Sequence, residues 1–113
     1  MHEDIMDWSS KHFYLGKLYA AETVAKHKLS ELPGVTNNPM TNIVLKLYDS
    51  KGQEGFEEIS NNSKAGPSFA NVGEAAIVVD CIEKLINNGL SADKIAVIAP
   101  YNYQVLEFMM RRC

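Results

Sequence analysis

One short apolar run that ends at a proline constrains the fold of this chain most strongly. Residues 95–99 read Ile-Ala-Val-Ile-Ala, an uninterrupted and partly β-branched run, and Pro100 follows at once. Such a run is typical of a strand that is buried on both faces of a parallel sheet. Proline has no N–H to give to a strand ladder, so the strand has to end there. We therefore expect an α/β fold with parallel strands.

The residues just after this strand are the candidate contact surface. Tyr101, Asn102 and Gln104 directly follow Pro100, and ligands of open α/β sheets bind beyond the carboxyl ends of the strands. Two interpretations stay open. In the first, Asn102 caps a following helix and Tyr101 packs. In the second, these side chains meet a phosphate–sugar backbone or stack on a base.

Composition narrows the possible partners. The formal net charge of the 113 residues is −3, so bulk charge gives no support for nucleic-acid binding, and any basic patch has to be local. The two cysteines, Cys81 and Cys113, are too few and too far apart for a disulfide framework or a zinc site. No apolar run approaches the roughly 20 residues that a membrane span needs. We expect an intracellular protein without a membrane segment or a metal site.

Local signals predict four helices and a second strand. Asn71 has the character of an N-cap, with Glu74 three positions later, and Asn88-Gly89 gives a stop signal. Alternating apolar residues favour a strand between Asn42 and Asp49. Helices are expected over residues 3–11, 20–29 and 71–88, with a last one starting near residue 102.

A long stretch rich in glycine, serine, asparagine and glutamate separates the second strand from the clearest helix. It covers residues 50–70, and structureless segments of this length are usually functional or disordered. We expect a mobile loop there. Strand, loop, helix, strand and helix form one βαβ unit, which needs further strands to make a covered parallel sheet. The chain is therefore expected to be part of a domain.

Motifs for catalysis are missing from the sequence. It contains no G-x-x-x-x-G-K-S/T phosphate loop, no nucleophile elbow and no zinc-protease spacing. The three histidines, His2, His12 and His27, are scattered along the chain. The residues themselves give no support for catalysis by this chain alone.

Several blocks, in order and in register, resemble the superfamily-1 helicases of the immunoglobulin mu-binding protein (SMUBP) type. The first block is Met-His-Glu-Asp-Ile-Met-Asp-Trp-Ser-Ser at residues 1–10, followed by Phe-Tyr-Leu-Gly-Lys-Leu at 13–18. Further blocks are Val-Ala-Lys-His at 24–27, Leu-Pro-Gly-Val at 32–35, Asn-Val-Gly-Glu-Ala at 71–75 and Ala-Pro-Tyr-Asn-Tyr-Gln-Val at 99–105. The last block is similar to helicase motif IV.

This resemblance implies a second RecA-like domain with a three-layer α/β fold. Such a domain closes on a first RecA-like domain across ATP, while single-stranded RNA or DNA crosses both. Members of the family hydrolyse ATP with Mg²⁺, move 5′ to 3′, and act in the cytoplasm or the nucleus. By the same resemblance, Pro100, Tyr101, Asn102 and Gln104 match the motif near the nucleic-acid strand.

The sequence departs from the family pattern in what surrounds these blocks. The Walker motifs of the first domain and the arginine motifs that complete an ATP site are absent from residues 1–113, and phosphoryl transfer needs them together. We therefore expect an incomplete RecA-like domain that is catalytically inactive alone. The alternative is a non-catalytic α/β module for nucleic-acid binding or protein interaction.

Overall fold

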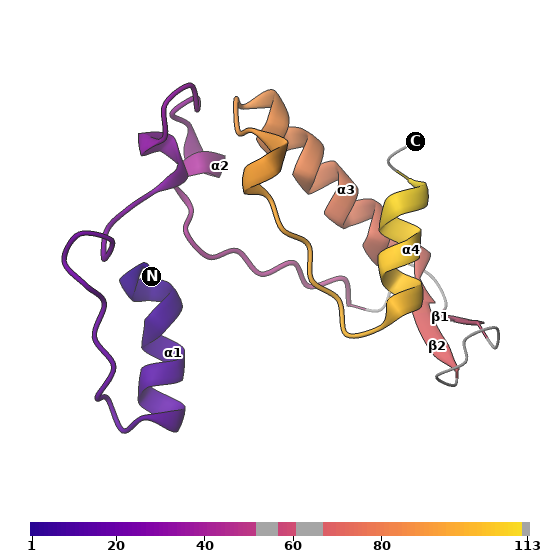
Figure 1. Cartoon of the computed structure of the whole chain (residues 1–113), viewed down its shortest axis with the longest axis horizontal. Helices are drawn as coiled ribbons and strands as arrows, with labels where there is room; N and C mark the ends of the chain where they lie inside the picture. Colours follow the sequence, from indigo (N-terminus) through magenta and orange to yellow (C-terminus); the bar gives the residue numbers. More distant parts are fainter. Residues whose placement is uncertain (52–56, 61–66, 112–113) are drawn as a thin grey trace. The chain divides into compact units, whose positions relative to one another are not determined.

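The computed structural model describes residues 1–51, 57–60 and 67–111. The elements in chain order are α1 (Glu3–Phe13), η1 (Leu29–Glu31), α2 (Pro39–Asn42), β1 (Glu57–Ser60), β2 (Ser68–Asn71), α3 (Val72–Asn87), η2 (Ala92–Lys94) and α4 (Asn102–Met110) (Figure 1). The chain divides into two compact units. The first holds Met1–Leu47 with Asn88–Leu90, and the second holds Tyr48–Asn87 with the residues from Ser91 onward.

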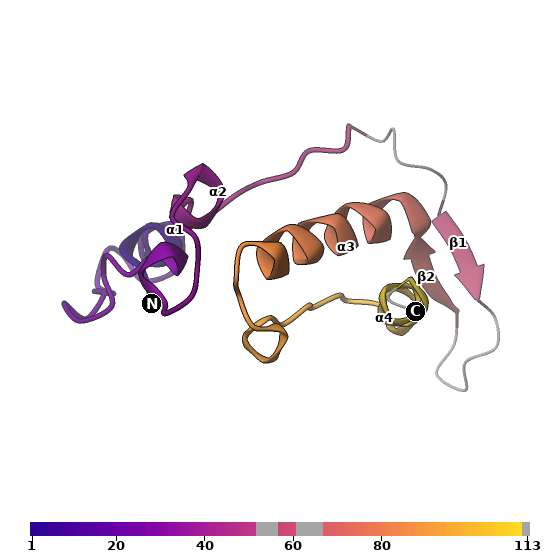
Figure 2. The same cartoon turned by 90° about the horizontal axis from the view of Figure 1, so that it is seen from above.

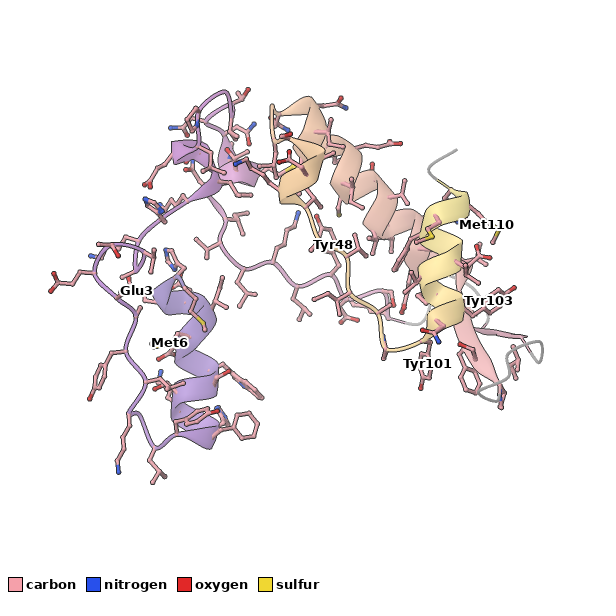
Figure 3. The ribbon with its side chains drawn as sticks, viewed as in Figure 1. Glu3, Met6, Tyr48, Tyr101, Tyr103 and Met110 are labelled. Atoms are coloured by element: carbon pink, nitrogen blue, oxygen red, sulfur yellow. The ribbon has the colours of Figure 1, made fainter. Side chains whose placement is uncertain are left out.

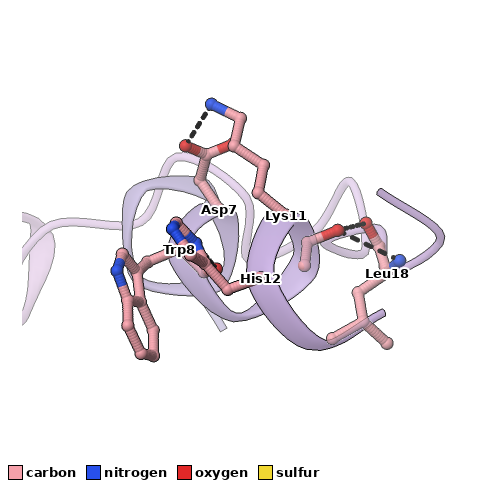
Figure 4. A network of polar contacts seen from close by, with 6 residues as sticks. Asp7, Trp8, Lys11, His12 and Leu18 are labelled. Atoms are coloured by element: carbon pink, nitrogen blue, oxygen red, sulfur yellow. Dashed lines mark hydrogen bonds and ion pairs between the residues drawn. The ribbon is translucent and has the colours of Figure 1, made fainter. Parts of the chain in front are cut away.

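Helix α1 of the first unit is held by side-chain contacts at its end and along one face. The buried Ser10 hydroxyl donates to the Leu18 carbonyl at 3.1 Å and accepts from the Leu18 N–H at 3.2 Å. Lys11 Nζ lies 2.7 Å from Asp7 Oδ2, one helical turn away (Figure 4). The Ser10 contacts fold the chain after α1 back onto its last turn.

The first unit also contains a turn around α2 that is held by polar contacts. Asn38 caps α2 in a capping box with Thr41. Thr41 is almost completely buried, and its hydroxyl donates to the Thr36 carbonyl at 2.6 Å. The Thr36 N–H donates to the Asn88 carbonyl at 2.8 Å, and the Asn38 amide donates to the Asn88 side-chain oxygen. Residues 88–90 are therefore fixed to the 36–41 turn.

The second unit packs two helices around a small hairpin. Strands β1 and β2 pair antiparallel, with Ile59 opposite Phe69. Helix α3 begins directly after β2, and α4 lies beside both α3 and β2 (Figures 1 and 2). The buried apolar residues of the second unit are Ala70 in β2 and Ala75 in the first turns of α3. The close approach of these elements rests on small side chains at the junction.

The predicted helices over 3–11, over 71–88 and from residue 102 are confirmed by α1, α3 and α4. The predicted helix over 20–29 is wrong, because this segment forms a turn at residues 22–26 followed by η1. A helix of ten residues is marginal without a packed face. The Ala25 carbonyl here accepts from the Glu3 N–H at 3.0 Å, so it supports the start of α1 instead of a local helix.

Both predicted strands are wrong for the described part of the chain. Residue 42 ends α2, and residues 43–49 then form no strand ladder. Residues 95–99 also lack a ladder, and the Ile98 side chain is 93% exposed instead of buried. An apolar run becomes a strand only when a neighbour pairs with it. Within residues 1–51, 57–60 and 67–111 no parallel pair forms, and the sheet is the β1–β2 hairpin.

The expectation of a structureless loop over residues 50–70 is also corrected. This stretch contains β1 and most of β2, because alternate residues of β2 pack inward and β1 supplies the ladder partner. Residues 52–56 and 61–66 lie outside the described residues, so the predicted mobility stays a prediction there.

Candidate functional site

Gln104 joins the start of α4 to the end of β2. Its side chain is buried, and its Oε1 accepts from the backbone N–H of Asn71 at 2.5 Å. Its Nε2 donates to the backbone carbonyl of the same residue at 3.1 Å. One amide thus pairs with Asn71 as a neighbouring strand would. In this structure the predicted contact residue Gln104 points inward and holds two elements together.

Asn71 is also the cap of α3. Its side-chain oxygen accepts from the Glu74 backbone N–H at 3.0 Å, as the sequence predicts for an N-cap. The Gln104 amide and this cap together fix the backbone of Asn71 at the point where β2 turns into α3. The residue is therefore a junction between β2, α3 and α4.

Two further residues of β2, Ser68 and Phe69, contact the start of α4. The hydroxyl of the buried Ser68 accepts from the Tyr103 N–H at 3.1 Å. The Phe69 ring meets the Tyr101 ring edge-to-face, with the ring centroids 5.2 Å apart. Tyr101 is the N-cap residue of α4 and Asn102 its first helical residue. The interpretation in which Asn102 caps this helix is therefore wrong, while Tyr101 does pack.

Pro100, Tyr101 and Asn102 form an exposed edge at the start of α4, which we call the α4 edge. The Tyr101 side chain keeps 46% of its surface exposed although one side meets Phe69. Figure 3 shows Tyr101 where the chain enters α4, next to β2. The structure thus brings three of the four predicted site residues to the surface, and Gln104 lies beneath them.

A small pocket of about 140 Å³ opens beside the α4 edge. We call it the edge pocket. Its lining residues come from β2, from the first turn of α3 and from the start of α4: Phe69, Ala70, Asn71, Glu74, Pro100, Tyr101 and Gln104.

Among the described residues that line the edge pocket, Glu74 is the charged one, and none is a lysine or an arginine. Elsewhere in the second unit Lys84 lies 2.5 Å from Asp80, and the hydrogen bond and the charge of Asp80 raise the pKa of Lys84 above its usual value. Arg111 Nε lies 3.9 Å from Glu107 Oε2. These two cations therefore lie within reach of carboxylates.

Neither a cluster of metal ligands nor a phosphate cradle is found among the described residues. In the part of the chain that the structure describes, no three histidine, cysteine, aspartate or glutamate side chains come close enough to hold a metal ion. The sequence also lacks the glycine-rich loop that cradles phosphates. The helices found among residues 1–51 and 67–111 include none with the length and apolar character to cross a bilayer.

Sequence reasoning misses Ser68, Phe69 and the place of Glu74 in the edge pocket. It assigns the segment before Asn71 to a loop, although Ser-Phe-Ala-Asn alternates as a short strand does. That alternation next to an N-cap asparagine is the available signal. For Glu74 the sequence indicates only a capping residue, because its place in the lining of the edge pocket depends on the fold.

Comparison with known proteins identifies the family. Residues 1–112 match the family described as "AAA domain", so the chain belongs to that family. The chain is 41% identical over 107 residues to the DNA-binding protein SMUBP-2 of Mus musculus. It is 40% identical over 110 residues to the DNA polymerase alpha-associated DNA helicase A of Saccharomyces cerevisiae. An uncharacterized ATP-dependent helicase of Methanocaldococcus jannaschii is 30% identical over 111 residues.

These matches confirm the resemblance to the SMUBP-type helicases. Each alignment covers 93% of this chain, but only 10% of the mouse protein and 16% of the yeast protein. Membership of the family indicates a P-loop NTPase-like fold, of which the described residues show the helices and a small sheet. The chain thus spans a small part of the length of its relatives.

Proposed function

We propose that this chain is part of the second RecA-like domain of an ATP-dependent 5′-to-3′ helicase and that its α4 edge contacts single-stranded RNA or DNA. The observation that carries the proposal is the arrangement at Tyr101. The Tyr101 ring packs edge-to-face on the Phe69 ring, with the ring centroids 5.2 Å apart. Tyr101 nevertheless remains 46% exposed at the start of a helix. The DNA-binding protein SMUBP-2 and the DNA polymerase alpha-associated DNA helicase A both align with 93% of the chain.

Each residue of the edge has a role that follows from its placement. The exposed part of the Tyr101 ring offers a stacking surface for one base. The exposed Asn102 lies in the first turn of α4, where a side-chain amide and the positive helix end suit a phosphate. Pro100 limits the backbone freedom before the helix. Gln104 positions the edge through Asn71.

In this proposal the complete helicase binds ATP and Mg²⁺, and this chain alone does not. The first RecA-like domain of the helicase would supply the phosphate cradle and would be the main protein partner, in the cytoplasm or the nucleus. This chain adds one side of the interdomain cleft and does not hydrolyse ATP alone, because its residues form no phosphate loop. A phosphate-release assay with Mg²⁺ checks this. Turnover that survives repurification of the chain would contradict it.

The nucleic-acid contact is tested by fluorescence anisotropy with a short, fluorescein-labelled oligothymidylate. Replacing a stacked aromatic residue by alanine costs about 1–3 kcal/mol per base, so Tyr101→Ala should weaken binding roughly tenfold or more. Tyr19→Ala is the matched control, because Tyr19 is 86% exposed and belongs to the first unit. If Tyr101→Ala binds as tightly as Tyr19→Ala, the α4 edge is not the contact surface.

A further inference from the structure

Helix α4 takes the cap of its first turn from another element. The hydroxyl of Ser68 in β2 accepts from the N–H of Tyr103, 35 residues further along the chain. We propose that Ser68 is a positioning residue for the strand contact, because its hydroxyl holds the first turn of α4 where Tyr101 can stack on a base. The inference rests on the proposed function and deepens it, since it names the residue outside the α4 edge that sets the position of Tyr101.

The sequence of α4 supplies no cap of its own. A helix begins with N–H groups that lack a partner inside the helix, and a Ser, Thr, Asp or Asn at the N-cap commonly accepts from one of them. In α4 the N-cap residue is Tyr101, whose side chain makes no capping hydrogen bond within the described helix. The first turn also lacks an acidic residue. Ser68 therefore takes the part that an N-cap side chain plays in other helices.

The Ser68 hydroxyl lies where water has little access. Ser68 keeps only 9% of its surface exposed, and it belongs to a strand that pairs with β1. The pairing fixes the backbone of Ser68, so the position of the acceptor is set before α4 meets it. If the hydroxyl is removed, water does not readily replace it, and the Tyr103 N–H loses this acceptor.

Two more contacts from β2 reach the same turn of α4. The Phe69 ring meets the Tyr101 ring, with the centroids 5.2 Å apart, and the Asn71 backbone pairs with the Gln104 amide. The Ser68 bond differs from these two because it holds the backbone of the helix instead of a side chain. It thus fixes the turn that carries the Tyr101 ring. A ring that is in place before binding spares the cost of ordering it when the strand arrives.

The cap itself is tested first, without nucleic acid. Ser68→Ala removes the hydroxyl, whereas Ser68→Thr keeps one and adds a branched side chain that suits a strand. Loss of the cap should speed amide hydrogen exchange at Tyr103 about two- to thirtyfold in Ser68→Ala, and Ser68→Thr should restore slow exchange. Equal exchange at Tyr103 in the unchanged chain and in Ser68→Ala overturns the inference and leaves the proposed function standing.

The positioning role is tested by anisotropy with the labelled oligothymidylate. Ser68→Ala should weaken binding about two- to tenfold, which corresponds to the cost of ordering one side chain on binding. In the Tyr101→Ala background the same change should cost much less, because no ring is left to position. Ser68→Thr should restore the binding. Ser9→Ala, which removes a hydroxyl from α1 of the first unit, is the control and should bind as the unchanged chain does.

The outcomes separate this inference from the proposed function. A loss of the same size in both backgrounds would mean that Ser68 only supports the fold, and it overturns the positioning role while the effect of Tyr101→Ala still supports the strand contact. If the unchanged chain does not bind the oligonucleotide, the proposed function fails and the positioning role fails with it. Where circular dichroism shows that Ser68→Ala loses helix, Ser68→Cys replaces it in both tests, because a thiol is a weak acceptor of similar shape.

Discussion

At the scale of single residues, the Gln104 side chain takes the place of a strand neighbour for Asn71. Leucine has a similar size but cannot make either hydrogen bond. In Gln104→Leu the Asn71 N–H and carbonyl therefore lose the partner that the amide provides. Leaving a buried polar group unsatisfied costs about 1–3 kcal/mol. We predict that Gln104→Leu speeds amide hydrogen exchange at Asn71 by about five- to 150-fold.

Asn102→Leu is the control for this prediction, since Asn102 is exposed on the same helix. Substitutions at such surface positions usually change stability by less than about 0.5 kcal/mol. Equal exchange rates at Asn71 in the two variants would show that the amide does not hold the junction.

A second prediction at this scale concerns the turn before residue 95. The hydroxyl of Ser91 donates to Asp93, and this hydrogen bond lowers the pKa of Asp93. A lowered carboxyl pKa stabilises the fold above the unfolded pKa, and that contribution is lost as the pH falls through the folded pKa. Ser91→Ala should therefore raise the pKa of Asp93 toward its usual value, as seen by NMR titration of the carboxyl carbon. An unchanged pKa would contradict the bond.

At the scale of elements, the stop of α3 depends on Gly89. Its φ is +93°, and a Cβ there would collide with the Gly34 carbonyl oxygen. The left-handed conformation alone costs a non-glycine residue about 1–2 kcal/mol, and the clash adds to it. Gly89→Ala should therefore speed exchange of the Thr36 amide, which donates to the neighbouring Asn88 carbonyl, by at least roughly tenfold.

Gly16→Ala is the matched control for the backbone strain. Gly16 has a φ of +74°, but a Cβ at this position would meet no other atom within 4 Å. The substitution should disturb its own turn by the strain alone and leave Thr36 unchanged. A Gly89→Ala chain with normal protection of Thr36 would contradict the close approach.

At this scale the ends of helix α3 could be predicted from the sequence, whereas the strands could not. The cap at Asn71 and the stop at Gly89 are local signals, and the structure confirms both. The strand predicted from Ile95 to Ala99 is wrong because pairing depends on a distant neighbour, and no local pattern supplies one. For the same reason the sequence locates the α4 edge but not the inward direction of Gln104, which depends on β2.

At the scale of the whole molecule, much apolar surface remains uncovered. The buried apolar residues of the described chain are Ala70, Ala75 and Leu90, while Trp8 is 58% exposed and Leu47 89% exposed. Soluble monomers rarely leave large apolar patches open. We predict that the isolated chain binds a hydrophobic dye such as ANS and melts over a broad temperature range by circular dichroism. A sharp transition without dye binding would contradict this.

The central claim is that single-stranded nucleic acid meets this chain at the α4 edge. The most direct measurement is a titration of the ¹⁵N-labelled chain with an unlabelled short oligonucleotide, followed by two-dimensional NMR. We predict that the amide signals of Tyr101 and Asn102 shift first and that those of α1 (Glu3–Phe13) stay in place. Shifts confined to α1, or no shift at Tyr101 and Asn102 at saturation, would contradict the claim.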